Sequence, residues 1–429
     1  MSPTDKKEVS FDVKTLTPLF TGNVKGGTER LRGTGLMGSL RWWLEVIARG
    51  LGHDACNGGG TDDCACPVCE VFGRTGEAKK FKLRVDGDPK KIHEKPLNFT
   101  VGGNGWFVGP AAFLGDLKLR FVFRNPPETE MDIETYFFWP ALALAERWGG
   151  LGAKTQLGFG VVKLPEPPTT VGGKGLEGII TKLGAGTRDA SEFPDLRDFF
   201  FAKVTFTPPD PWNPRLVIPF NKKPRNETEV QRKEREEKDK KETEEWLKKW
   251  RIEKGYVPSA FSAKYALRYG NNKSSILHGV GDGESAVARA LFGTTEDPAR
   301  ISRIHVSWAY PAYAEDGVAA DGRWRFRVWG WLDKEWTQSD ANRDGVLDSL
   351  KAILENKNGA SGATTFWEKY LGFPEREPKP EMLDIDWREF WSQGTGGRDN
   401  SGVPYGKGPE GVVAFLKHLC GVSDKVVTR

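Results

Sequence analysis

The chain has 429 residues, enough for two or three domains that each bury a core. Its 63 lysines and arginines stand against 59 aspartates and glutamates, so a net charge of +4 excludes a uniformly basic protein, and any basic surface must be local. No run approaches the roughly twenty apolar residues of a membrane span, and residues 1–10 lack the apolar core of a signal peptide. We therefore expect a soluble, cytoplasmic protein with no membrane partner.

Residues 1–164 predict a first domain in which strands and helices alternate. Residues 35–52 carry apolar side chains at three- and four-residue spacing, typical of an amphipathic helix, and residues 117–124 alternate between apolar and largely basic positions, typical of a half-buried strand. The expected elements are a strand at 9–16, the helix at 35–52, strands at 79–85 and 117–124, a helix at 132–148, and a strand ending at 163. This βαββαβ order is the ferredoxin-like (RRM-like) pattern of an α+β fold.

Residues 165–195 are rich in Pro, Gly and Thr and are expected to link this domain to a second one, residues 196–429. Strand signals at 199–206, 303–310 and 324–332 are interleaved with helical signals at 284–291 and 344–356, so the second domain is again expected to be α+β. A short repeat, Val71-Phe72-Gly73 against Leu291-Phe292-Gly293, favours two related halves.

Residues 222–254 are mostly charged, and Glu and Lys or Arg recur at helical spacing. The pattern predicts a long charged helical insertion in the second domain. A solvated or partly disordered arm is the alternative interpretation.

Four of the five cysteines lie close together in sequence, at Cys56, Cys64, Cys66 and Cys69. Cys66 and Cys69 have the spacing of a zinc knuckle, and the other two complete a tetrahedral set, which His53 could join in place of one cysteine. Four protein ligands leave no open position for water, so the predicted zinc is structural and there is no catalytic cofactor. A redox pair at Cys66 and Cys69, or free thiols, are the alternatives.

Two glycine-containing loops offer hydrogen-bond donors that could bind phosphate. Residues 25–35 place Arg30, Arg32 and Thr34 just before the first helix, where backbone N–H groups attract phosphate. Residues 149–160 contain five glycines around Lys154-Thr155-Gln156, whose donors suit phosphate and sugar contacts. The second loop lacks the Gly-Lys-Ser/Thr of a P-loop, which argues against nucleotide hydrolysis, and a tight structural turn is the alternative interpretation.

The sequence shows no catalytic constellation. The five histidines, His53, His93, His278, His305 and His418, are scattered and form no HxH or HxxxH pattern. Asp340, Asn342, Asp344 and Asp348 match the start of an EF-hand loop, but Lys351 stands where the bidentate glutamate belongs. A turn that caps the next helix is the favoured interpretation, with a calcium loop as the alternative.

Residues 15–22 (TLTPLFTG) and 31–43 (LRGTGLMGSLRWW) together resemble the opening motif of the RAMP superfamily of CRISPR proteins, and within it the family of first subunits of Cmr effector complexes. A Cys/Phe-Gly element at 69–73 and the loop 152–160 follow in the order that the resemblance requires. The cysteine cluster and the insertion at 222–254 are departures from the family pattern.

The resemblance implies two ferredoxin-like RAMP domains and a non-catalytic role in a type III-B CRISPR ribonucleoprotein that silences matching RNA. The chain would contact the 3′ part of the guide RNA or the guide–target duplex, together with neighbouring RAMP subunits, and another subunit would cleave the target. The RNA-binding residues expected from motif position and chemistry, with Trp42 as the candidate for an exposed ring, are Arg30, Arg32, Thr34, Arg41, Trp42, Arg74, Lys154, Thr155 and Gln156.

Two other classes of function stay open. One is a RAMP endoribonuclease that processes guide RNA with a His, Lys or Tyr as general acid or base, and His53 is the histidine near the relevant loop. The other is a protein-binding scaffold whose charged arm recruits partners.

Overall fold

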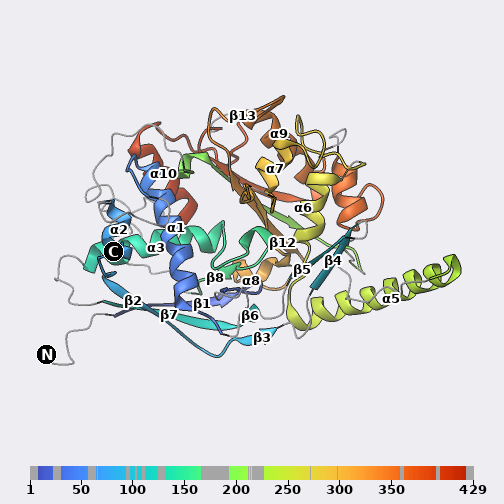
Figure 1. Cartoon of the computed structure of the whole chain (residues 1–429), viewed down its shortest axis with the longest axis horizontal. Helices are drawn as coiled ribbons and strands as arrows, with labels where there is room; N and C mark the ends of the chain where they lie inside the picture. The colour runs from blue at the N-terminus through green and yellow to red at the C-terminus, as the bar shows by residue number, and fades with distance from the viewer. Residues whose placement is uncertain are drawn as a thin grey trace.

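The computed structural model is an α+β protein built on two antiparallel sheets (Figure 1). It describes residues 8–22, 30–56, 64, 66–92, 97–101, 104–108, 112–123, 131–165, 193–210, 212, 214, 227–270, 272–296, 298–357, 362–392 and 397–421. Among these residues, no helix combines the length and the apolar character needed to cross a membrane. The predicted linker at 165–195 lies largely outside the described residues.

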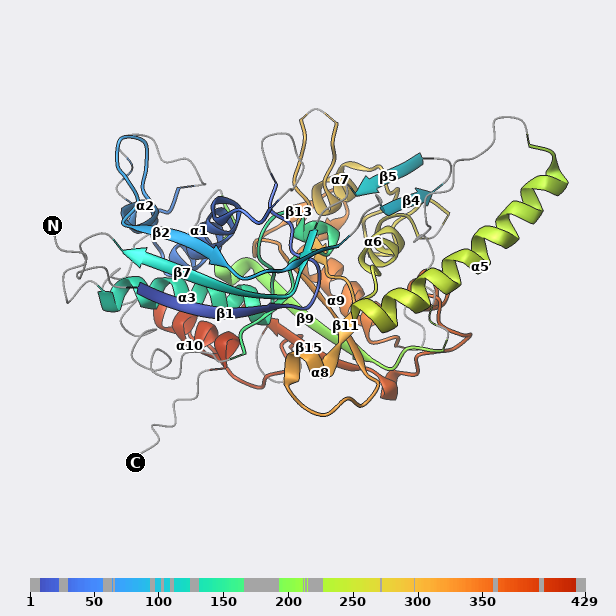
Figure 2. The same ribbon diagram turned by 90° about the horizontal axis from the view of Figure 1, so that it is seen from below.

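The first sheet contains β1 (Glu8–Thr15), β2 (Phe81–Asp86), β7 (Asp116–Phe123) and β8 (Val162–Lys163) in the spatial order β2-β7-β1-β8. In β7, Leu117, Leu119, Phe121 and Phe123 are buried while Lys118 is exposed, as the alternation predicts. The buried face packs on α1 (Gly33–Gly50) and α3 (Met131–Arg147), and Pro140 lies within α3. Figure 2 shows β1, β2 and β7 from below, with these helices behind them.

Four short strands between β2 and β7 have no counterpart among the sequence predictions. They form two hairpin-like pairs, β3 (Lys90–Ile92) with β6 (Ala112–Leu114) and β4 (Leu97–Val101) with β5 (Asn104–Val108). Such short strands give too little alternation to be distinguished from loops.

The second sheet contains β9 (Phe199–Phe206), β10 (Ile304–Val306), β12 (Trp324–Trp331) and β15 (Asp384–Glu389) in the order β10-β12-β9-β15, and β11 (Tyr310–Pro311) pairs with β12. Both faces of β9 are buried: Phe199 and Phe201 join the core of the first sheet, while Phe200 and Val204 join the second core. The two sheets are therefore packed through a shared layer of side chains.

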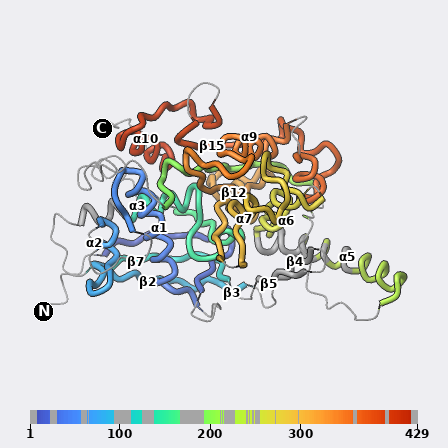
Figure 3. Tube along the Cα trace, turned by 45° about the horizontal axis from the view of Figure 1, so that its top comes forward, coloured from blue at the N-terminus to red at the C-terminus, as the bar shows by residue number. Residues whose placement is uncertain are grey.

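The remaining helices of the second half are α6 (Ala260–Tyr269), α7 (Ala286–Phe292), α8 (Ala312–Asp316), α9 (Arg343–Leu354) and α10 (Pro409–Cys420). α10 returns to the first half and packs on α3 (Figure 3), where the Trp148 indole donates to the carbonyl of Leu419 at 2.8 Å. Shorter elements are α2 (Pro67–Phe72), η1 (Thr155–Leu157), η2 (Leu196–Asp198), β13 (Thr337–Gln338), β14 (Ala341–Asn342), the π-helical turn η3 (Thr365–Tyr370) and η4 (Pro380–Met382).

The charged segment forms α5 (Glu229–Lys254), a helix of 26 residues that extends away from the body (Figures 1 and 2). Thr228 and Gln231 cap its start reciprocally, the Thr228 hydroxyl accepting from the Gln231 backbone N–H at 3.3 Å. Its ion pairs at i, i+4 spacing are exposed, and such pairs contribute to the stability of a helix in contact with water.

Candidate nucleic-acid interface and metal centre

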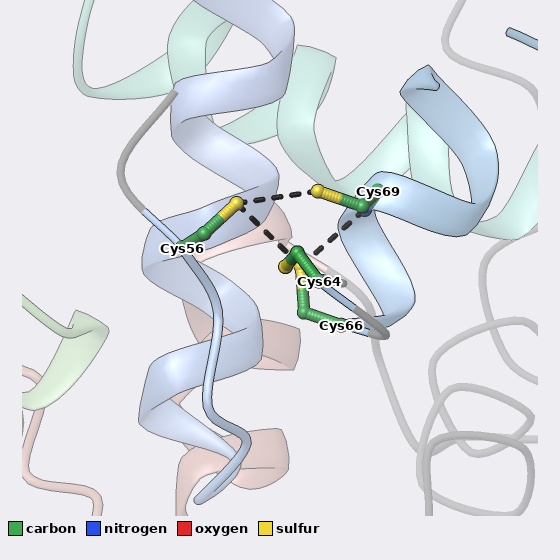
Figure 4. Close-up of side chains that lie close together, drawn as sticks. All are labelled: Cys56, Cys64, Cys66 and Cys69. Atoms are coloured by element: carbon green, nitrogen blue, oxygen red, sulfur yellow. Dashed lines mark hydrogen bonds between the residues drawn. The ribbon is translucent and has the colours of Figure 1, made fainter. Parts of the chain in front are cut away.

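The four clustered cysteines converge on one point beside α1 (Figure 4). Cys66 is the N-cap of α2, with Pro67 in the first turn, and this turn brings Cys69 back toward it. The Sγ atoms of Cys56 and Cys69 lie 3.2 Å apart, those of Cys66 and Cys56 lie 3.7 Å apart, and all four lie within 4.8 Å of one another. Tetrahedral zinc with Zn–S bonds of about 2.3 Å places its sulfurs about 3.8 Å apart, so the donor set fits this ion.

Burial and hydrogen bonds shift the pKa of three of these thiols. Burial raises the pKa of Cys69 and Cys56, whereas for Cys66 burial is outweighed by hydrogen bonds that lower the pKa. Metal binding must therefore displace protons from Cys56 and Cys69. His53 lies outside the group of converging ligand atoms that the described residues form, so the structure favours the all-cysteine set.

Three arginines surround the cysteine cluster. Arg41 directs Nη2 at the Sγ atoms of Cys69 (3.0 Å) and Cys56 (3.4 Å). Arg49 donates from Nε and Nη2 to the carbonyls of Ala55 and Cys56, each at 2.9 Å, and Arg74 donates to the carbonyl of Cys64. The guanidinium groups of Arg41 and Arg74, both expected at an RNA interface, are thus engaged with the cysteine segments.

The N-terminus of α1 has the features of an anion site. Its N-cap is Arg32, no side-chain hydrogen bond caps it among the described residues, and no acidic residue lies in its first turn. Thr34 and Arg30 are exposed there. The Nε of Arg32 is buried and meets no acceptor within the described part of the chain. The helix dipole and this donor both favour a negative ligand.

Residues Phe20 and Thr21 join this helix end to the glycine-rich loop. The Thr21 hydroxyl accepts from the Arg32 backbone N–H at 3.0 Å, and the Phe20 carbonyl accepts from the Ala153 N–H at 2.8 Å. The Lys154 ammonium lies 4.0 Å from the centroid of the Phe20 ring, and burial lowers the pKa of Lys154. Both residues belong to the TPLFT motif, which is the signal that could have pointed to them, but no role was predicted for either.

The other side chains of the glycine-rich loop face the second half of the protein. His305 donates from Nε2 to the Ser302 carbonyl at 3.0 Å, so its Nδ1 accepts from the Thr155 hydroxyl at 3.3 Å. Lys264 donates to the carbonyl of Gln156 at 3.2 Å, and burial lowers the pKa of Lys264 to about 7. At Thr155 and Gln156 the loop therefore also connects the two halves. The periodicity of apolar residues in the sequence could not indicate these contacts.

The prediction of an exposed ring at Trp42 needs correction. The Trp42 ring is half-buried and packs on Trp43, Phe199, Trp329 and Trp331, with centroid separations from 4.8 to 6.1 Å. Helical spacing placed it at the flank of the apolar stripe, but the second sheet covers that flank.

The acidic segment at 340–348 is a helix cap. The Asn342 Oδ1 accepts from the Gly345 N–H at 2.8 Å, and Asp348 pairs with Arg398 at 2.8 Å. These contacts agree with the favoured interpretation of a capping turn.

Comparison with known proteins gives one family match. Residues 12–163 match the model described as the RAMP superfamily. No curated protein matches the sequence. Similar solved structures include the apo form of Cmr1 from Pyrococcus furiosus, which is 14% identical with a TM-score of 0.34, the match covering 79% of this chain and 92% of that one.

Two further similar structures are cryo-EM structures of the Type III-B Cmr-beta bound to cognate target RNA. One is 15% identical, with 36% of this chain and 53% of that chain covered. The other, which also holds AMPPnP and was determined in the presence of ssDNA, is 13% identical, with 43% and 65% covered. Both have a TM-score of 0.25.

Proposed function

We propose that the chain is an RNA-binding subunit of a type III-B CRISPR (Cmr) effector ribonucleoprotein, because residues 12–163 match the model described as the RAMP superfamily. In this proposal it contacts the 3′ part of the guide RNA or the guide–target duplex and neighbouring RAMP subunits, in antiviral RNA silencing. It binds RNA without cleaving it, and another subunit cuts the target.

The convergence at Phe20 and Thr21 carries this proposal. It brings the N-terminus of α1 and Lys154 of the glycine-rich loop to one place, although more than a hundred residues separate them in sequence. Arg30, Arg32, Thr34 and Lys154 are the residues that we propose to contact phosphates.

The other five predicted RNA-binding residues have internal partners. We propose that Arg41 and Arg74 support the cysteine segments, that Trp42 supports the packing of the two sheets, and that Thr155 and Gln156 hold the loop against the second half. These residues shape the interface without themselves contacting RNA.

We also infer two ferredoxin-like domains, residues 1–164 and 196–429, joined by 165–195, with α5 in an insertion of the second. The strand orders support this inference. In both sheets the first strand lies between the third and the fourth, and the second lies at the edge beside the third. The positive-φ glycines Gly73 and Gly293 occupy matching places after α2 and α7, and the residue after each glycine, Arg74 or Thr294, forms an isolated β-bridge.

The cysteine cluster supports a structural zinc ion held by Cys56, Cys64, Cys66 and Cys69. The ion would fasten the segment after α1 to the start of α2. All four ligands come from the protein, so the ion would stabilise this part of the fold and supply no reactive position.

Filter binding of the purified protein to labelled single-stranded RNA across a salt series tests the proposal, with products examined on a denaturing gel. Binding that weakens steeply with salt and yields no products supports it. Cleaved RNA would favour the processing nuclease. If neither the isolated protein nor its assembly with partner RAMP subunits cross-links to RNA, the proposal is wrong, and salt-insensitive partner binding alone would favour the scaffold.

A further inference from the structure

In each half of the protein, an arginine on a helix donates to the carbonyl of a glycine that directly follows another helix. We call this contact the arginine brace. Arg41 is the ninth residue of α1 and donates from Nη1 to the Gly73 carbonyl at 3.0 Å. Arg268 is the ninth residue of α6 and donates from Nη1 to the Gly293 carbonyl at 2.9 Å. Each arginine follows a leucine and precedes an aromatic residue, which is a sequence correspondence that the short Phe-Gly repeat alone does not show.

The braced turns are also alike. Gly73 has φ 81° and ψ 165°, and Gly293 has φ 80° and ψ 169°. A Cβ at Gly73 would lie 2.7 Å from the Lys79 nitrogen, and a Cβ at Gly293 would lie 2.7 Å from the Arg300 oxygen. Both positions therefore require glycine, and both carbonyls are aimed at the helix arginine.

The two braces differ in the group that accepts a hydrogen bond from Nη2 of the arginine. In the second half, Nη2 of Arg268 donates to the carboxylate of Glu284 at 3.3 Å. In the first half, Nη2 of Arg41 meets the sulfurs of Cys69 and Cys56. The thiol cluster thus occupies the place that an anion occupies in the other half.

From this correspondence we propose that Arg41 hydrogen-bonds the metal-bound thiolates of Cys56 and Cys69 and offsets the negative charge of the metal centre. The inference rests on the proposed zinc site. Zinc with four thiolates carries a charge of −2, and such a charge is costly in a partly buried place without a cation. The Arg41 side chain is 15% exposed and bonded at Nε to Glu45 at 2.9 Å, so its guanidinium is fixed before metal binds.

Competition for metal tests the role of Arg41. The protein is stripped of metal, reloaded with Co²⁺ or Zn²⁺, and titrated with a chromophoric chelator. Arg41→Gln should weaken metal affinity about 10- to 100-fold, the usual effect of losing a group that supports the ligands. The Co²⁺ form also reports thiolate coordination through its charge-transfer absorption.

Arg268→Gln is the matched control, because it removes the same glycine-carbonyl brace in the other half, away from the thiols. It should leave metal affinity unchanged. If Arg41→Gln does not fold, Arg41→Lys keeps the charge but loses the fork, and it should show a smaller loss of affinity.

The outcomes separate the two proposals. Wild-type protein that takes up no stoichiometric Co²⁺ or Zn²⁺ would overturn the metal site itself. Tight binding by wild type with unchanged affinity in Arg41→Gln would overturn the role of Arg41 and leave the metal site standing. Equal losses in Arg41→Gln and Arg268→Gln would show a general effect of the brace and would also overturn that role.

Discussion

Gly158 and Trp308 pack against each other where the glycine-rich loop meets the second half, and the Trp308 backbone N–H donates to the Gly158 carbonyl at 3.2 Å. The Trp308 indole N–H donates to the neighbouring Leu157 carbonyl at 2.8 Å, and a Cβ at Gly158 would lie 2.2 Å from Cδ1 of the ring. Gly158 also has φ 94°, in the left-handed region. A side chain at this position would force the two halves apart.

Gly158→Ala should therefore destabilise the protein strongly. Positive φ alone costs roughly 1–2 kcal/mol, and overpacking typically adds about 1–3 kcal/mol. The measurement is the free energy of unfolding from urea titration. Gly281→Ala is the control, because Gly281 has φ 69° and nothing lies within 4 Å of its added Cβ. Equal losses in the two variants would contradict the close packing of Gly158 on Trp308.

Lys154→Ala should weaken RNA binding without unfolding the protein. If Lys154 neutralises one phosphate, the slope of log K against log salt should become less negative by about 0.7, the value for a single-stranded ligand. Lys233→Ala on α5, a lysine whose side chain is 74% exposed, is the matched control and should leave the slope unchanged. Identical slopes for wild type and Lys154→Ala would remove Lys154 from the interface.

The sequence was informative where local pattern decides structure. The alternation of apolar residues predicted β7, and their helical spacing predicted α1. Both patterns are visible in the sequence because the strand and the helix each bury one face. The spacing of the cysteines likewise predicted that the four thiols lie close together. Position in the chain could not show that Thr155 meets His305 or that Trp42 meets Trp329, because both contacts depend on how the two sheets pack.

Arg41 illustrates the same limit. Motif position and chemistry placed Arg41 among the expected RNA-binding residues, but the segments that carry Cys56 and Cys69 lie against its guanidinium group. A charged residue on a predicted helix face can be recognised from sequence, whereas the segment that later covers that face cannot.

The Cys66→Ser, Cys69→Ser double variant should lose bound zinc and unfold at a lower temperature than wild type, because metal binding contributes to folding free energy. Metal content is measured by mass spectrometry and Tm by calorimetry. A chelator should lower the Tm of wild type but not that of the double variant. Cys420→Ser is the control for losing a buried thiol away from the cluster. Stoichiometric metal retained by the double variant would refute the ligand assignment.

His305 should make stability depend on pH. Burial, with Lys264 nearby, lowers the pKa of His305 from its ordinary value near 6.5 to about 3. Between these values the unfolded chain binds a proton that the folded protein does not, so stability is fully present above about pH 6.5 and falls as pH drops toward 3. The contribution is at most about 1.4 kcal/mol per pH unit.

A His305→Gln variant removes this titration while keeping groups that hydrogen-bond. It should be less stable than wild type near neutral pH, because the contacts with Thr155 and Ser302 are altered, but the difference should narrow as pH falls from 6.5 to 4. Urea titrations at several pH values measure both curves. Parallel curves for the two proteins would mean that His305 is protonated as readily in the folded state as in the unfolded state, and that the contact with Thr155 tolerates an imidazolium.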